Sequence, residues 1–219
     1  ALHRAGKKII LVNCSGSPIG LEPETQKCEA ILQAWYPGQQ GGKAVAEVLF
    51  GDYNPAGKLP VTFYRNVSQL PDFEDYNMTG RTYRYMQDVP LFPFGYGLSY
   101  TTFGYGKTVL DKNELTAGQS LKLTVPVTNT GKRNGEEVVQ VYLRKQGDAE
   151  GPIKTLRAFK RVSIPAGKTV NVEFDLKDKE LEWWDDQSNT VRVCPGNYDI
   201  MVGGSSKEEE LQRTTIAIK

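Results

Sequence analysis

Histidine and cysteine are scarce in this sequence, and their scarcity narrows the chemistry that the chain can support. The only histidine among the 219 residues is His3, so near the first residue that we do not expect a mechanism with a histidine base. The three cysteines, Cys14, Cys28 and Cys194, leave at least one thiol unpaired and do not follow a metal-ligand spacing. Pairing of Cys14 with Cys28 stays open, but we expect ordinary buried thiols, because free cysteine packs as a small apolar side chain.

Excess charge and long apolar runs are also absent. The formal net charge is +1, which gives no electrostatic reason to bind nucleic acid or a membrane surface. The longest apolar run, residues 9–12, falls far short of the roughly 18 to 20 residues of a membrane-spanning helix and fits a buried strand. Phosphate-binding, dinucleotide-binding and metal-ligand motifs are missing, so we expect no cofactor and no metal.

The first hundred residues have the pattern of an α/β layer. The run Lys7–Cys14 is apolar and β-branched and ends in a Ser-Gly-Ser-Pro loop, which indicates a parallel strand buried on both faces. We expect a helix over Glu24–Leu32 and a short strand over Ala34–Tyr36. A second helix is expected from Gly41 to a stop at Gly51, with an apolar stripe of Ala44, Val45, Val48 and Leu49.

Those elements are too few to make a domain. Two or three strands and two helices do not cover both faces of a parallel sheet, and parallel sheets are rarely exposed. The sequence shows no signal peptide and starts at Ala1 rather than methionine, which fits either a processed protein or a fragment. We therefore expect residues 1–64 to be the C-terminal part of a larger α/β sandwich domain. Residues 65–90 lack periodicity and predict a long irregular loop within a linker of residues 65–104.

From residue 105 onward the hydrophobic period changes to two. Short alternating strands are separated by Gly, Pro and Asn, which predicts an all-β sandwich of the immunoglobulin or fibronectin type III kind over residues 105–219. Pro126 places its run, which starts at Leu121, towards a sheet edge. We expect Trp183 and Trp184 to plug the core or a seam rather than to form a sugar platform, which would need a flat exposed ring.

Between the two patterns lies an aromatic and glycine-rich run, residues 92–103 (FPFGYGLSYTTF). Rings fill an interdomain seam, and glycines allow close backbone approach. We therefore interpret this run as the seam between an incomplete α/β part and a complete β-sandwich.

Three motifs together resemble glycoside hydrolase family 3. They are WYPGQQGG at residues 35–42, LFGDYNPAGKLP at residues 49–60 and FGYGLSY at residues 94–100, in the order and at the spacing of that family. The stretch NCSGSP at residues 13–18 is similar to the strand and loop that precede them. The resemblance covers the chain from about residue 6 to its end.

The segment GRTYRY at residues 80–85 resembles the β-xylosidase and xylosidase/arabinofuranosidase branch more than the β-glucosidases. It makes Arg81, Tyr83 and Arg84 candidates for the rim of a sugar site. The alternative for the two arginines is an ion pair with an acid of the same loop, namely Asp72, Glu74 or Asp75.

The resemblance implies a retaining, exo-acting glycosidase that removes sugars from the non-reducing ends of plant-polysaccharide oligosaccharides. Such an enzyme needs two carboxyl groups roughly 5 to 5.5 Å apart. In this family the nucleophilic Asp lies on an N-terminal (β/α)8 barrel, and the acid/base Glu also lies upstream of the segment matched here. We therefore assign no catalytic residue to this chain, and read its acids as solvated loop charges.

On this interpretation the partners are an oligosaccharide, bound through the full-length enzyme, and the upstream barrel, with no nucleic acid and no membrane. A secreted or periplasmic location is implied, and the chain alone is expected to be inactive. A β-glucosidase portion and a non-catalytic carbohydrate- or protein-binding sandwich stay open as alternatives.

Overall fold

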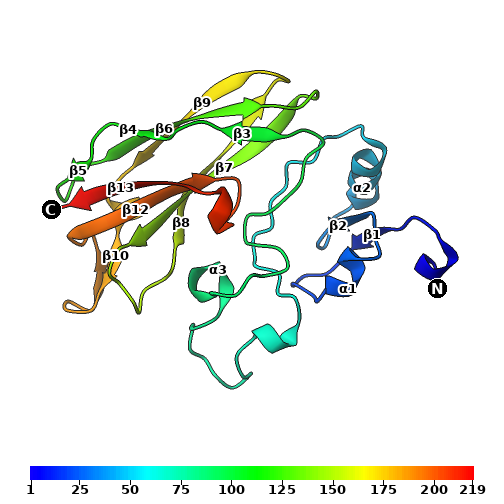
Figure 1. The fold of residues 1–219 in the computed structure, drawn as a ribbon, viewed down its shortest axis with the longest axis horizontal. Coiled ribbons are helices and arrows are strands. Elements are labelled where there is room, and N and C mark those ends of the chain that lie inside the picture. Colours follow the sequence, from blue (N-terminus) through cyan, green and yellow to red (C-terminus); the bar gives the residue numbers. More distant parts are fainter.

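The computed structural model describes residues 1–219 and has an α/β part followed by a β-sandwich, as the sequence predicts (Figure 1). The elements of the first part are η1 (His3–Ala5), β1 (Ile10–Asn13), α1 (Glu22–Thr25), β2 (Ala30–Gln33), α2 (Gly41–Phe50), η2 (Val67–Gln69) and α3 (Thr82–Tyr85). Strands β1 and β2 form a parallel pair with Leu11 opposite Ile31. None of the helices is long and apolar enough to cross a membrane.

The prediction of a helix over Glu24–Leu32 is wrong. Helix α1 begins with Pro23 in its first turn and ends at Thr25, and the apolar residues that follow form β2. They pair with β1, so a parallel partner overrides local helix propensity. The strand predicted over Ala34–Tyr36 is wrong as well, because Trp35 has a left-handed backbone with φ of 56°.

The prediction that the three cysteines are buried thiols is confirmed for Cys194 alone. All three thiols are free, but only Cys194 is buried, whereas Cys28 is half-buried and Cys14 is exposed. Cys14 directly follows β1, at the start of the Ser-Gly-Ser-Pro loop, where the chain turns towards solvent.

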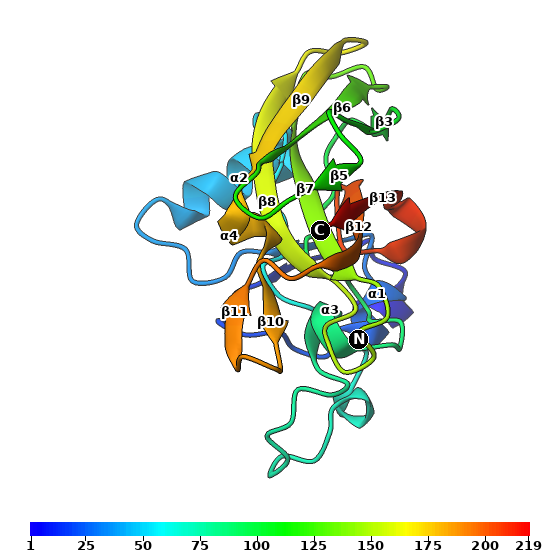
Figure 2. The ribbon, with the colours of Figure 1, turned by 90° about the vertical axis from the view of Figure 1, so that its left-hand side faces the viewer.

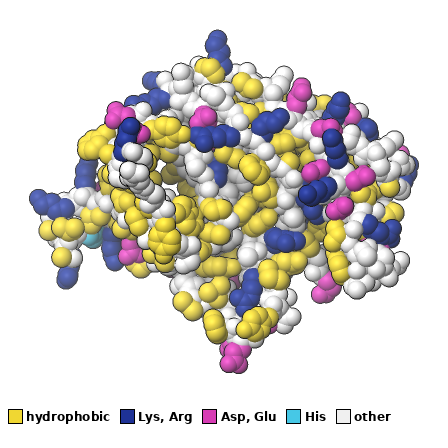
Figure 3. Space-filling view, turned by 180° about the vertical axis from the view of Figure 1, so that it is seen from behind, with side chains coloured by type: hydrophobic (Ala, Val, Ile, Leu, Met, Phe, Trp, Pro, Cys, Tyr) yellow, Lys and Arg dark blue, Asp and Glu magenta, His cyan; other side chains and the backbone are white.

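Helix α2 has the bounds that the sequence predicts, and Gly51 ends it in a left-handed conformation. Its apolar stripe is not buried within this chain. Phe50 is 84% exposed, Leu49 and Ala44 are exposed, and Ile10 of β1 is also exposed. Hydrophobic side chains accordingly gather over the N-terminal part of the molecule, at the left and centre of Figure 3. A two-stranded parallel sheet with one such helix leaves apolar surface that a larger α/β unit would cover.

The β-sandwich consists of two sheets around one core (Figure 2). One sheet has the order β5-β13-β12-β7-β8, and the other has β3-β6-β4 with β9 on the opposite side of β6. Their strands are β3 (Phe103–Tyr105), β4 (Val109–Leu110), β5 (Glu114–Leu115), β6 (Leu121–Asn129), β7 (Gly135–Lys145), β8 (Thr155–Ile164), β9 (Thr169–Leu176), β12 (Gly196–Gly203) and β13 (Gln212–Ile218). The period-two prediction is confirmed, since buried residues alternate along β6 and β9.

Pro126 does not mark an edge strand, because β6 lies between β9 and the pair β3 and β4. The Pro126 carbonyl accepts from Gly106 N at 2.7 Å, in the short break between β3 and β4. The amide N and the carbonyl of a strand residue point to the same neighbour, so the missing N–H of Pro126 faces this break. Proline is tolerated here because no ladder bond is lost.

The two tryptophans separate. A hairpin of β10 (Trp183–Asp185) and β11 (Thr190–Arg192) follows the short helix α4 (Asp178–Leu181). Trp183 is buried in the core, as predicted, and packs edge-on against Tyr198. Trp184 points the other way and is 49% exposed, so the prediction of a plug is wrong for this residue.

Residues 65–90 are mostly irregular, as predicted, but contain the two short helices η2 and α3. The bridge between Phe63 and Phe92 closes the base of this loop. At its far end Phe73 and Tyr76 are 94% and 90% exposed, on the segment that projects from the body at the bottom of Figure 1.

The aromatic and glycine-rich run lies against β7 and forms the seam. The buried Gln140 amide donates to the Gly95 carbonyl at 3.1 Å and to the Gly204 carbonyl at 2.6 Å. Gly95 has φ of 78°, and a side chain there would meet Gln140 Oε1 at 2.1 Å. The Phe94 carbonyl accepts from Ser206 N at 2.9 Å. The seam therefore depends on close backbone approach.

A buried ion pair crosses the same seam. Lys58 Nζ lies 3.2 Å from Glu137 Oε1, and the two side chains are 15% and 7% exposed. The Tyr105 hydroxyl donates to the same carboxylate oxygen at 2.8 Å. Burial and the charge of Glu137 both raise the pKa of Tyr105, so the phenol remains a donor. This pair ties the NPAGKLP motif to strand β7.

We predict that Glu137→Gln lowers the free energy of unfolding by roughly 2 to 3 kcal/mol, because it leaves the buried Lys58 ammonium without a counter-charge. The neighbouring Glu136 pairs with Arg161 at the exposed surface, so Glu136→Gln is the control and should change stability by less than about 1 kcal/mol. Urea denaturation of both variants measures the difference. Equal losses would contradict a seam that depends on the buried pair.

A second prediction concerns the seam glycine. Gly95 and Gly118 both have positive φ, but a side chain at Gly118 meets nothing within 4 Å. Gly118→Ala should therefore cost only the backbone strain, about 1 to 2 kcal/mol. Gly95→Ala should cost roughly 1 to 3 kcal/mol more, because Gln140 must move. Thermal and urea unfolding compare the two, and equal midpoints would show that the close approach carries no weight.

Candidate functional site

The segment Gly80–Tyr85 holds its backbone in an unusual conformation. Thr82, a β-branched residue, has φ of 56°, where such residues are genuine outliers. Two side chains of the α/β part hold it there. The Thr82 amide donates to the Tyr64 hydroxyl at 2.8 Å, and the Tyr83 amide donates to Thr62 Oγ1 at 3.0 Å. Such strain is found at functional sites, where the surroundings over-determine the conformation.

Arg81 binds the backbone of the loop that precedes it. Its guanidinium donates to the carbonyl of Asn77 at 3.0 Å, to that of Asp72 at 3.3 Å and to that of Asp75. No carboxylate of the loop pairs with it, so the ion-pair alternative is wrong as a direct contact. The Asn77 amides, backbone first and then side chain, hold the pKa of Asp75 below its ordinary value, with a smaller contribution from the Arg81 charge. Arg81 therefore orders the loop that carries Phe73 and Tyr76.

Tyr83 points towards the β-sandwich. Its ring stacks on Phe94 with centroids 4.2 Å apart and meets Tyr142 edge-on. Its hydroxyl accepts from the amide of Leu156 in β8 at 3.1 Å. Tyr83 thus joins α3, the seam and the sandwich.

Arg84, in α3, contacts the loop before β8. Its carbonyl accepts from the Ile153 amide at 2.6 Å, and its guanidinium lies 5.7 Å from the Tyr85 ring centroid. Its Nε is buried without a hydrogen-bond partner. Neither Asp72, Glu74 nor Asp75 pairs with it.

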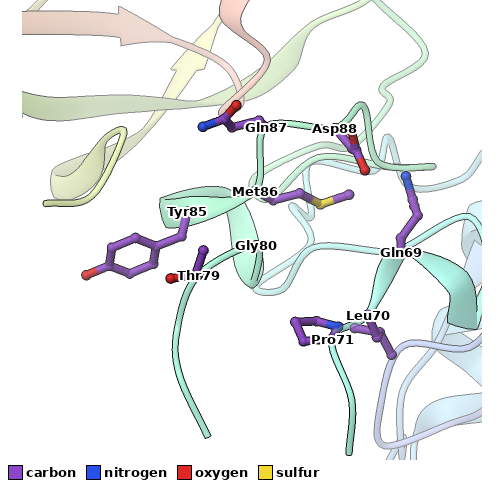
Figure 4. A pocket seen from close by; sticks show the side chains of 9 residues that line it. All are labelled: Gln69, Leu70, Pro71, Thr79, Gly80, Tyr85, Met86, Gln87 and Asp88. Atoms are coloured by element: carbon purple, nitrogen blue, oxygen red, sulfur yellow. The ribbon is translucent and has the colours of Figure 1, made fainter. Parts of the chain in front are cut away.

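The three candidates therefore do not converge on one cavity. The pocket of about 290 Å³ next to α3 is lined by other residues of the same loop, among them Leu70, Gly80, Tyr85 and Met86 (Figure 4). Arg81, Tyr83 and Arg84 point respectively to the loop, to the sandwich and to a separate groove. The motif resemblance identified the segment but not these directions.

The motif at residues 35–42 contains a turn at Trp35 and Tyr36 that was not predicted from the sequence. Trp35 has positive φ and packs edge-on against Phe63, while Tyr36 is 80% exposed. Gly16 lies so near the Tyr36 ring that a side chain there would meet it at 2.5 Å. The signal for this turn was the Pro37-Gly38 pair, which argues against a strand reaching residue 36.

None of the acids with a displaced pKa in this chain shows an upward shift. Displaced pKa values are found at Asp75, Asp185 and Glu208, and all three are lowered. Hydrogen bonds from Ser188 and Arg192 lower the pKa of Asp185 to about 2. Burial opposes the shift at Glu208, but the hydrogen bond and charge of Lys154, together with the charges of Arg213 and Arg144, outweigh it. A general acid needs the opposite shift. No group of His, Cys, Asp and Glu is arranged to hold a metal ion.

Comparison with known proteins decides the family. Residues 1–100 match the glycosyl hydrolase family 3 C-terminal domain, and residues 137–206 match a fibronectin type III-like domain. The chain belongs to glycoside hydrolase family 3. The resemblance in the motifs at residues 35–42, 49–60 and 94–100 is thereby confirmed.

The relatives are longer proteins. The chain is 56% identical to a xylan 1,4-beta-xylosidase of Xylanibacter ruminicola over 100% of this chain and 25% of that protein. It is 38% identical to a periplasmic beta-glucosidase of Salmonella typhimurium over 94% of this chain and 28% of that protein. The chain thus spans about a quarter of the length of the curated relatives it matches.

Solved structures of β-glucosidases share the fold. The β-glucosidase EmGH1 of Erythrobacter marinus superposes with a TM-score of 0.86 at 41% identity, over 100% of this chain and 29% of that chain. A β-glucosidase of Listeria innocua in complex with glucose gives a TM-score of 0.84 at 29% identity, over 99% of this chain and 31% of that chain.

We predict that Arg81→Lys loosens the loop of residues 71–80, because a single ammonium does not reach three carbonyls. Chymotrypsin should then cleave after Phe73 or Tyr76 severalfold faster, since local opening governs proteolysis. Arg192→Lys changes an exposed arginine of the β10–β11 hairpin and is the control. Unchanged cleavage in Arg81→Lys, measured by mass spectrometry over time, would contradict the ordering role.

Proposed function

We propose that this chain is the C-terminal part of a retaining, exo-acting β-xylosidase that removes sugars from the non-reducing ends of plant-polysaccharide oligosaccharides. The observation that carries the proposal is the 56% identity to a xylan 1,4-beta-xylosidase along the whole chain. A beta-xylosidase of Formosa agariphila, 41% identical over the whole chain, also supports it. The alternative is a β-glucosidase, favoured by the names of the Salmonella relative and of the superposed structures.

The exposed apolar surface of α2 and β1 supports an upstream partner. Phe50 and Ile10 are exposed here, and an exposed patch of this kind marks a contact surface. The upstream part is proposed to contain the catalytic barrel with both carboxylates, and to bind the oligosaccharide. In this arrangement the chain supports the catalytic part. The chain is proposed to consist of the end of an α/β sandwich domain (residues 1–64), a long loop and linker (residues 65–104) and a fibronectin type III-like sandwich (residues 105–219).

Arg81, Tyr83 and Arg84 remain proposed as residues near the rim of the sugar site. Arg81 fits this position best, because it orders a loop that exposes Phe73 and Tyr76. These two rings are proposed to face the upstream part that binds the sugar. Tyr83 is held by the sandwich, so its contribution is to position α3. A periplasmic or secreted location is proposed from the Salmonella relative, which is named as periplasmic.

The decisive test compares this chain with the full-length protein on 4-nitrophenyl β-xyloside and β-glucoside. The chain alone should give no turnover above buffer, because it lacks the paired carboxylates. The full-length protein should prefer the xyloside at least tenfold in kcat/KM, or about 1.4 kcal/mol.

Two outcomes would change the proposal. Turnover by the chain alone would overturn the upstream placement of the carboxylates. A preference of the full-length protein for the glucoside would leave the family intact and favour the β-glucosidase alternative.

A further inference from the structure

A second pocket, of about 180 Å³, lies where α3 meets the β-sandwich. Its walls come from four segments: α3 with Arg84, the loop of residues 148–152 between β7 and β8, β8 with Arg157, and the β10–β11 hairpin with Trp184. The β10–β11 hairpin and α3 are neighbours at the lower left of the body in Figure 2. None of the family motifs at residues 35–42, 49–60 or 94–100 contributes to it.

Two arginines that line this pocket each have a buried Nε without a hydrogen-bond partner. Only three buried side-chain polar atoms in the chain make no hydrogen bond: Arg84 Nε, Arg157 Nε and Thr155 Oγ1. Two of them belong to pocket residues, and Thr155 lies two positions before Arg157 on β8. Neither arginine forms an ion pair with a carboxylate. Arg157 Nη2 instead donates to the backbone carbonyl of Glu182. Buried donors without partners call for an explanation, and a bound molecule with acceptor oxygens supplies one.

The two guanidiniums also act on each other. Burial, and next the positive charge of Arg84, lower the pKa of Arg157. Like charges held together out of water are costly, so an oxygen-bearing ligand that accepts from both would offset the cost.

The charge of the pocket selects against an anion. Three carboxylates, of Asp148, Glu150 and Asp186, share the walls with the two arginines. Asp148 accepts from Trp183 Nε1 at 2.6 Å and from Gly151 N at 2.8 Å. Glu150 is exposed and makes no ion pair. A ligand must therefore donate to carboxylates and accept from guanidiniums at once, which hydroxyl groups do.

Trp184 supplies an aromatic face. Half of this side chain is exposed, and its Nε1 donates to Asp186 Oδ1 at 2.8 Å, which fixes the indole plane. The hairpin beneath it is held by the Asp185–Arg192 ion pair at 2.7 Å. A held, half-exposed indole beside hydrogen-bonding groups offers an apolar face to a ring whose rim is polar.

We propose that this pocket binds a neutral saccharide ring, whose apolar face lies on Trp184 and whose hydroxyls accept from Arg84 and Arg157 and donate to Glu150 and Asp186. The inference concerns binding alone, so it does not depend on the activity proposed above. Failure of hydrolysis would leave it standing, and failure of binding would leave the hydrolase proposal standing.

The three indole N–H signals of the chain, from Trp35, Trp183 and Trp184, give a direct test by ¹⁵N NMR. The Trp184→Phe variant lacks one of these three signals, and the missing signal is thereby assigned to Trp184. Titration of the 219-residue chain with xylobiose should shift the Trp184 signal saturably and leave the Trp35 signal in place. The same titration of the full-length protein gives the readout if dispersion of the signals is lost in the shorter chain.

Calorimetry with matched variants completes the test. Trp184→Ala should weaken xylobiose binding at least tenfold, whereas Phe159→Ala, which removes an exposed aromatic ring outside the pocket, should leave it unchanged. Glucuronate and acetate are run beside xylobiose and cellobiose. Binding of the two anions alone would overturn the neutral-saccharide assignment. A flat Trp184 signal with every sugar, or equal effects of the two variants, would overturn the site.

Discussion

The seam between the α/β part and the β-sandwich depends on one buried amide. Gln140 joins the carbonyl of Gly95, in the aromatic run, to that of Gly204, just after β12. This places Phe94 where Tyr83 stacks on it, and Tyr83 in turn carries α3. A strand of the sandwich thus determines the position of α3. Through Arg81 it also determines the position of the projecting loop. Rigid packing makes such transmission possible, because close-packed interiors do not deform continuously.

Strong periodicity was enough to predict the sandwich and helix α2, because their apolar patterns persist over many residues and agree with their turns. It failed where a few residues were ambiguous. The run Ala30–Leu32 suits either a helix or a strand, and only the presence of β1 beside it decides. Pro126 was misjudged because the break between β3 and β4 that accommodates it is a property of the neighbouring strands.

The candidate site was predictable as a segment but not as an arrangement. The motif resemblance named Arg81, Tyr83 and Arg84, yet their directions follow from contacts across the sequence, such as Tyr83 with the Leu156 amide. Trp184 was within reach of sequence reasoning. In a strand adjacent side chains face opposite ways, so a core position for Trp183 already implied an outward Trp184. No sequence pattern near Arg84 or Arg157 predicts that these two side chains lie close together.

The clamp at Gly95 also has a consequence for the order of assembly. Chains leave the ribosome from the N-terminus, and early segments fold first. Gly95 emerges well before Gln140, and Gly204 later still, so the aromatic run must wait for both partners. Strand β5 likewise waits for β13, with which it pairs in parallel. Contacts of such long sequence separation form slowly. The α/β part therefore emerges with its seam uncovered, and the seam closes only after β7 and β12 have been synthesised.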